Sequence, residues 1–144
     1  AAITHQSGSY KEDLTILRLV GSFVGQTSGK VLYETHYTKS LVETVYSSQP
    51  YSLISIHNHG TNVPPSGADF GSAGEKRYAF GIVACHDGNV YYYSAQNARP
   101  FATNIIDNIV DTKVKPPYNM GEIDAREFAL DQVAHDYGIE WRKL

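Results

Sequence analysis

The stretch from residue 51 to residue 69 constrains this chain most, because it joins an apolar run to a short segment rich in chemically active side chains. Residues 51–56, with the sequence YSLISI, form a mainly apolar run that predicts a strand reaching His57. His57 and His59 stand two positions apart, and side chains two apart in a strand project from the same face. The loop that follows is rich in Pro and ends at Ser66, the expected first residue of a helix. The stretch therefore predicts a strand, a loop and a helix, as in α/β folds.

Two imidazoles and a carboxylate come together within this unit. Asp69 lies in the first turn of the expected helix, so the loop can return its carboxylate toward His57 and His59. Two neutral imidazoles and one carboxylate supply three ligands of a catalytic zinc site, in which the fourth position holds water. The sequence therefore predicts a Zn²⁺ site made of these three residues.

Each part of the pattern also has a purely structural explanation. Paired histidines on a strand commonly form hydrogen bonds in a core or at a surface. Ser66 suits the N-cap of a helix, and Asp69 is favoured near the positive end of a helix dipole. A capping role is compatible with metal binding, because a residue in the first turn can also point at an ion. The order and spacing of the whole set favour the metal site.

Composition excludes several other classes of protein. The chain has 144 residues, of which 42% are hydrophobic and 19% charged, as expected for one globular domain with a core. The net charge of −3 gives no electrostatic footprint for nucleic acid or an anionic membrane. No apolar run reaches the roughly 20 residues of a membrane span, and nothing at the N-terminus reads as a signal peptide. Cys85 is the single cysteine, which fits a cytoplasmic location. The abrupt start indicates a fragment of a longer protein.

The rest of the chain alternates between segments that predict strands and segments that predict helices. Strands are expected at 14–20, at 30–36 and in a hairpin over 77–94, and a loop is expected at 21–29. The hairpin turns at Asp87-Gly88, a dipeptide typical of type I′ turns. Helices are expected at 40–48, 66–76, 105–110 and 120–137. The sequence thus predicts a single α/β domain over 1–144, with a mixed sheet flanked by helices, a core at about 10–95 and a C-terminal extension at 96–144.

The last expected helix has the clearest ends. Asn119 followed by Glu122 is similar to a capping box, and Gly138 is expected to end the helix. The helix is expected to carry one apolar stripe, formed by Ile123, Leu130, Ala134 and Tyr137.

The segment HNHGTNVPPSGAD resembles the metal-binding signature of the JAMM (MPN+, JAB-like) zinc metalloprotease family, H-x-H followed by S-x-x-D. The resemblance covers roughly residues 10–95 and implies a JAMM-like, cytidine-deaminase-like fold. It also implies a zinc-dependent enzyme that cleaves a peptide or isopeptide bond. In such a site His57, His59 and Asp69 bind the zinc, and Ser66 orients the water or stabilises the oxyanion.

Two departures place the chain in a divergent branch of that family. Gly60 stands where the family usually has proline, and the loop 60–65 has one residue fewer than is usual. The sequence SIHNHGTNVPPSGADF, followed by GIVACHDGNVYYYS, is similar to JAMM-like domains at the C-termini of phage head-morphogenesis and prophage proteins. This likeness implies a bacterial or phage-infected host cytoplasm, or association with a virion.

The family also uses an upstream glutamate as general base, for which the chain offers two candidates. Glu12 immediately precedes the first expected strand, and Glu34 lies on the second. A glutamate at the first strands, ahead of the helix before H-x-H, corresponds best to Glu12, so Glu34 is the second choice. Neither assignment follows from spacing alone.

Other reactive side chains are weaker candidates. Cys85 and His86 are adjacent, so on a strand they would point to opposite faces. Cys85 is therefore expected to be a small buried hydrophobe, and His86 to lie on the surface of a turn.

Three functions remain open at this point. The first is a zinc-dependent hydrolase with a protein or peptide substrate. The second is a JAMM-like module that binds a partner, in a phage protein, without catalysis; the intact residues of the motif argue against it. The third is a metal-dependent hydrolase with a non-peptide substrate, which the acidic charge balance disfavours. The oligomeric state and the identity of the substrate are not encoded in any motif.

Overall fold

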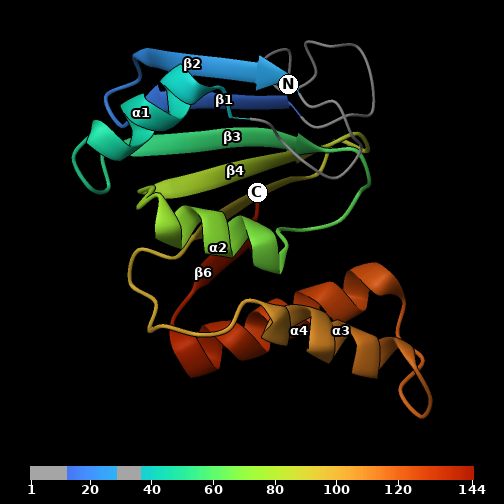
Figure 1. The fold of residues 1–144 in the computed structure, drawn as a ribbon. Helices are drawn as coiled ribbons and strands as arrows, with labels where there is room; N and C mark the ends of the chain where they lie inside the picture. The colour runs from blue at the N-terminus through green and yellow to red at the C-terminus, as the bar shows by residue number, and fades with distance from the viewer. Residues whose placement is uncertain (1–12, 29–36) are drawn as a thin grey trace.

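A computed structural model describes residues 13–28 and 37–144. In these ranges the chain forms a six-stranded mixed sheet and four helices (Figure 1). In chain order the elements are β1 Asp13–Arg18, β2 Phe23–Ser28, α1 Lys39–Ser47, β3 Leu53–His59, α2 Gly67–Glu75, β4 Phe80–Cys85, β5 Val90–Ser94, α3 Asn104–Val114, α4 Glu122–Tyr137 and β6 Glu140–Lys143. The predicted fold class, a mixed α/β domain with a C-terminal helix, is confirmed.

The sheet has the strand order β2-β1-β3-β4-β5-β6. Only β3 and β4 run parallel among these neighbours; the other four pairs are antiparallel. A parallel pair needs a long crossover, and the chain between β3 and β4 supplies it with α2. In the strand order the histidine strand β3 is an inner strand, and the chain after it leads into α2 (Figure 1).

Helices α1 and α2 cover the same face of the sheet. Leu41 of α1 lies against Gly25 of β2, and Phe70 of α2 packs edge-on against Tyr93 of β5 at 5.3 Å between ring centroids. Gly25 and Tyr93 belong to one row across five of the six strands, together with Ile16, Ser55 and Gly81. Because residues in one row share a face, both helices and the buried core lie on that side.

The C-terminal region completes the same domain. Helices α3 and α4 pack against each other, and Ile106 on α3 and Ala125 and Ala129 on α4 are fully buried. After α4 the chain returns to the sheet as β6, which pairs with β5. No helix in the described ranges is long and apolar enough to cross a membrane.

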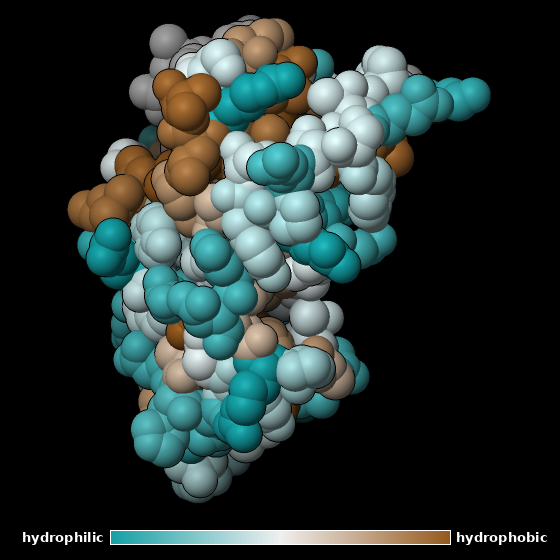
Figure 2. Space-filling view, turned by 90° about the vertical axis from the view of Figure 1, so that its left-hand side faces the viewer, coloured by the Kyte–Doolittle hydropathy of each residue, from teal (hydrophilic) through white to brown (hydrophobic). Residues whose placement is uncertain are grey.

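Exposed apolar side chains gather at one end of the sheet. Leu19, Val20 and Phe23, in and beside the β1–β2 turn, are more than half exposed. Figure 2 faces this end of the molecule and shows a hydrophobic area over it. The end of β3 that carries the histidines lies at the opposite end of the sheet (Figure 1).

The expected loop at 21–29 is wrong, because residues 23–28 form β2. Gly25, which reads as a loop residue, lets Leu41 of α1 approach this strand closely: a Cβ there would lie 2.6 Å from Cδ1 of Leu41. A glycine inside a strand often marks such a close approach. The strand expected at 30–36 lies outside the described residues.

Expectations for the C-terminal region hold only in part. The helix expected at 105–110 is present but longer, over Asn104–Val114, and β6 has no counterpart among the expected elements. The capping box at Asn119 and Glu122 does not form: Gly121 is the N-cap of α4, and none of the described side chains caps it. The apolar stripe is confirmed at Leu130, which is buried, and at Ala134 and Tyr137, which pack against the core, whereas Ile123 is 39% exposed. The buried residues of α4 are Ala125, Ala129, Leu130 and Val133.

Other local predictions hold. Helix α1 and helix α2 begin within one residue of the expected positions, and Gly138 ends α4 with a φ of 83°. The hairpin of β4 and β5 is present, but its turn is not type I′, because Gly88 has a positive φ and Asp87 does not. The Asp87 carboxylate instead accepts the N–H of Asn89 at 2.9 Å, within a longer connection.

Candidate metal centre

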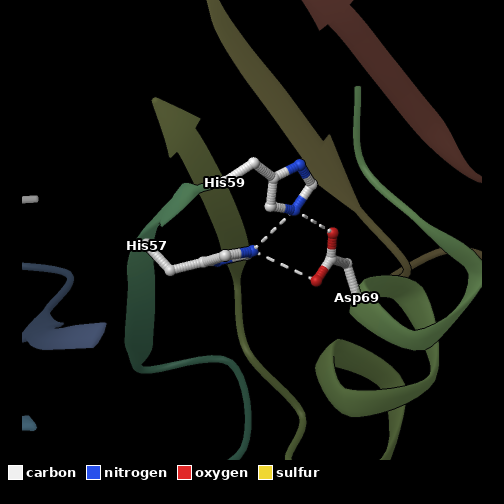
Figure 3. Close-up of side chains that lie close together, drawn as sticks. All are labelled: His57, His59 and Asp69. Carbon is white, nitrogen blue, oxygen red and sulfur yellow. Dashed lines mark hydrogen bonds and ion pairs between the residues drawn. The ribbon is translucent and has the colours of Figure 1, made fainter. Parts of the chain in front are cut away.

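Strand β3 brings the two histidines to one place. His57 and His59 lie at its C-terminal end, on the face that the helices cover (Figure 3). The strand is held on both sides, since His57 is paired with Leu14 of β1 and Val83 of β4. Both imidazoles are buried, with 6% and 8% of the side-chain surface exposed. The expectation that the two rings share a face is confirmed.

Helix α2 brings the carboxylate through a capping box at its N-terminus. The Ser66 hydroxyl accepts the N–H of Asp69 at 3.2 Å, and Oδ2 of Asp69 accepts the N–H of Ser66 at 2.8 Å. This reciprocal pair fixes the Asp69 side chain in the first turn. Ser66 therefore is an N-cap, and the same cap directs Asp69 toward the end of β3 (Figure 3).

The ligand atoms of three residues converge between β3 and α2. His57 Nε2 lies 3.1 Å from Oδ1 of Asp69, His59 Nε2 lies 3.0 Å from Oδ2, and the two Nε2 atoms are 3.2 Å apart (Figure 3). Tetrahedral zinc, with bonds of about 2.0–2.2 Å, holds its N and O ligands about 3.4 Å apart, close to these distances. The three residues could hold a metal ion.

The hydrogen bonding of His59 also suits a metal ligand. Its Nδ1 lies 2.8 Å from the carbonyl oxygen of Val63, which can only accept, so Nδ1 carries a hydrogen. In the neutral ring Nε2 then presents its lone pair to a carboxylate oxygen of Asp69. Two acceptors 3.0 Å apart require a proton or a cation between them. Metal-bound histidines typically donate their second N–H in this way.

The loop 60–65 is fastened to the β4–β5 hairpin. The Val63 carbonyl also accepts from Sγ of Cys85 at 3.5 Å, and Oδ1 of Asn62 accepts the N–H of Asp87 at 3.0 Å. Burial raises the pKa of Cys85 to about 12, with a smaller contribution from Asp87, so the thiol stays protonated and can donate. These contacts let the short loop return Asp69 to the histidines.

Asp69 is ionised in this environment. Burial by itself raises the pKa of Asp69, but the Coulombic attraction of His57 and His59 and their hydrogen bonds to the carboxylate outweigh it. The pKa of Asp69 is consequently held well below its ordinary value. The centre thus offers one negative ligand beside two imidazoles.

The structure places four of the six predicted site residues. His57, His59 and Asp69 meet, and Ser66 lies in the cap beside them, whereas Glu12 and Glu34 lie outside the described residues. The predicted burial of Cys85 and the exposure of His86 are confirmed.

Sequence reasoning missed the residues that support the ligands. The contacts of Val63 and Cys85 with the His59 region depend on the parallel pairing of β3 with β4, which places His59 beside Cys85. No short-range sequence pattern predicts that β3 pairs with β4. The Asn62 contact with the hairpin is of the same kind, since its partner is 25 positions away.

No protein-family model matches the chain, and neither a curated protein nor a solved structure matches it. The resemblance to the JAMM signature therefore remains a prediction that depends on residues 57–69. The finer JAMM-like and cytidine-deaminase-like description of the fold is not confirmed by these comparisons.

Proposed function

We propose that this protein is a zinc-dependent hydrolase that cleaves a peptide or isopeptide bond. The observation that carries the proposal is the convergence of His57, His59 and Asp69, whose ligand atoms all lie within 4.8 Å of one another. The resemblance of the same segment to the JAMM signature supports this choice of reaction and a protein or peptide substrate. The proposed setting is a bacterial or phage-infected cytoplasm, or a virion.

The residues divide the chemistry between them in this proposal. His57 and His59 bind as neutral imidazoles, and Asp69 adds a negative charge. A zinc ion held there supplies Lewis acidity and lowers the pKa of water from about 15.7 to roughly 7. Ser66 still has its hydroxyl hydrogen to donate to a developing oxyanion, because its oxygen is the acceptor in the cap. Glu12, or Glu34 as second choice, accepts a proton from the attacking water and returns it to the leaving amine.

Metal binding is the first test. The full chain should bind one zinc per molecule in equilibrium dialysis, and His57→Ala should abolish this. His135→Ala is the matched control, because that imidazole is 89% exposed on α4, and it should bind zinc like the wild type. Zinc at 100 times its Kd should stabilise the wild type by about 2.7 kcal/mol. A wild type that neither binds zinc nor gains stability from it contradicts the proposal.

Hydrolysis is the second test. Zinc-loaded protein, incubated with peptide and isopeptide libraries, should release new amines, and chelation should stop the release. Glu12→Gln should keep its zinc and lose about 10²–10⁴-fold in rate, as expected for a general base, while Glu34→Gln keeps most of the rate. The reverse result assigns the base to Glu34. Equal rates before and after chelation would exclude metal-dependent hydrolysis.

A further inference from the structure

Helix α2 approaches the start of α3 without a side chain between them. A Cβ on Gly67, the first residue of α2, would lie 2.4 Å from the backbone oxygen of Thr103. A Cβ on Gly71 would lie 3.2 Å from Cγ2 of the same threonine. Residues four apart lie on the same face of a helix, so both glycines belong to this one contact.

Thr103 is itself held in place by α3. Its carbonyl oxygen accepts the N–H of Ile106 at 3.3 Å in the first turn of that helix. Ile106 is fully buried, and α3 packs on α4. The carbonyl therefore cannot give way to a new side chain on α2 unless the α3–α4 pair moves with it.

The contact lies next to a metal ligand. Asp69 stands between Gly67 and Gly71 in the same first turns of α2, and its Oδ2 lies 3.0 Å from Nε2 of His59. A displacement of this end of the helix moves the carboxylate relative to the histidines, which are anchored in the sheet. Metal affinity responds to such changes outside the ligand set, typically by 10–100-fold.

We propose that Gly67, Gly71 and Thr103 are positioning residues of the metal centre, through which helices α3 and α4 set the place of Asp69. The inference deepens the proposed function and takes metal binding as its main readout. It gives a role to the C-terminal region, which lies outside the part of the chain that resembles the JAMM family.

The glycine pair can be tested against a third glycine on the same helix. A Cβ on Gly74 would meet only Cβ of Ala95, at 4.0 Å, which is ordinary contact. Gly74→Ala therefore controls for any general effect of adding a methyl group to α2. Thr103→Ala removes Cγ2 but leaves the carbonyl, and no side-chain cap is lost, since the Thr103 hydroxyl does not cap α3.

The experiment measures the zinc Kd of the full chain by chelator competition, below the unfolding transition of each variant. Gly67→Ala should raise the Kd about tenfold or more, and Thr103→Ala should not rescue it, because the clash is with backbone. Gly71→Ala should raise the Kd less, and Thr103→Ala combined with it should restore the wild-type value. Gly74→Ala should leave the Kd unchanged.

Several outcomes overturn the inference. A folded Gly67→Ala variant with the wild-type Kd does so, and so does an equal loss in Gly74→Ala. If Gly67→Ala does not fold, the zinc Kd of Gly71→Ala and of its combination with Thr103→Ala tests the proposal. A Kd that rises in Gly71→Ala and is not restored by Thr103→Ala counts against it.

A metal-free readout separates this inference from the proposed function. In imidazole ¹H–¹⁵N spectra of the metal-free chain, Gly67→Ala should shift the resonances of His57 and His59, and Gly74→Ala should not. If the wild type binds no zinc, the proposed function fails, and these spectra alone decide the inference. Unchanged spectra in Gly67→Ala would then overturn it.

Discussion

The two oxygens of Asp69 serve different partners. Oδ1 lies near His57, while Oδ2 accepts the N–H of Ser66 and lies near His59. One carboxylate thus begins a helix and completes a ligand set at the same time. An alanine here removes both functions, whereas an asparagine keeps one oxygen for the cap and loses the charge and the second acceptor oxygen.

The lowered pKa of Asp69 predicts a pH dependence of stability that Asp69→Asn lacks. Because the folded-state pKa is depressed, the carboxylate stabilises the fold above its unfolded value of about 3.9, and this contribution is lost as the pH falls toward the folded-state value. Urea unfolding of the metal-free chains between pH 3 and pH 7 should show a wild-type stability that falls at the acid end more steeply than that of Asp69→Asn. Parallel curves for the two chains would contradict the assignment.

At the scale of elements, one tyrosine joins three strands beneath the metal centre. Tyr93 of β5 extends across Gly81 of β4 and brings its hydroxyl within 3.3 Å of Oγ of Ser55 on β3. Its ring also meets that of His57 edge-on, at 6.1 Å between centroids. The absence of a side chain at Gly81 is what leaves space for this crossing.

Gly81→Ala should therefore destabilise the fold more than an alanine at a tolerant glycine. The new Cβ would lie 2.2 Å from Cζ of Tyr93, so the ring must move, and overpacking of this kind typically costs about 1–3 kcal/mol. Chemical denaturation gives the difference, with Gly74→Ala as the reference. Equal stabilities of Gly81→Ala and the wild type would mean that the Tyr93 ring can adopt another position at no cost in stability.

How far the sequence predicts these elements depends on how local their causes are. The end of α4 at Gly138 and the cap of α2 at Ser66 follow from residues within one turn, and both were predictable. The glycine of strand β2 lies against α1, and β6 pairs with β5 across a long stretch of sequence. Such long-range causes leave no periodic pattern in the strand itself.

The candidate site was predictable for the same reason. His57, His59 and Asp69 lie within thirteen residues, and a strand, a loop and a helix cap are enough to bring them together. The supporting contact at Thr103 joins segments more than thirty residues apart and could be found only in the folded structure.

At the scale of the whole molecule, the single tryptophan lies far along the chain from the metal centre. Trp141 is on β6, where its indole N–H donates to Oδ1 of Asp131 at 3.0 Å. If the sheet and helices unfold as one unit, urea transitions followed by Trp141 fluorescence and by far-UV circular dichroism should coincide. Zinc should move both transitions to higher urea by the same amount. A fluorescence transition that zinc leaves in place would show that β6 unfolds independently.

The three ligands lie close together in the sequence, and this affects the rate of folding. Ten positions separate His59 from Asp69, and a loop of that length closes in about 10–100 ns. The ligand contacts can therefore form before strands from distant parts of the chain have paired, and zinc present from the start should nucleate this segment. We expect stopped-flow refolding to accelerate with zinc, while Asp69→Asn refolds at one rate with or without it. Zinc that only slows unfolding would instead place the assembly of the centre after the rate-limiting step.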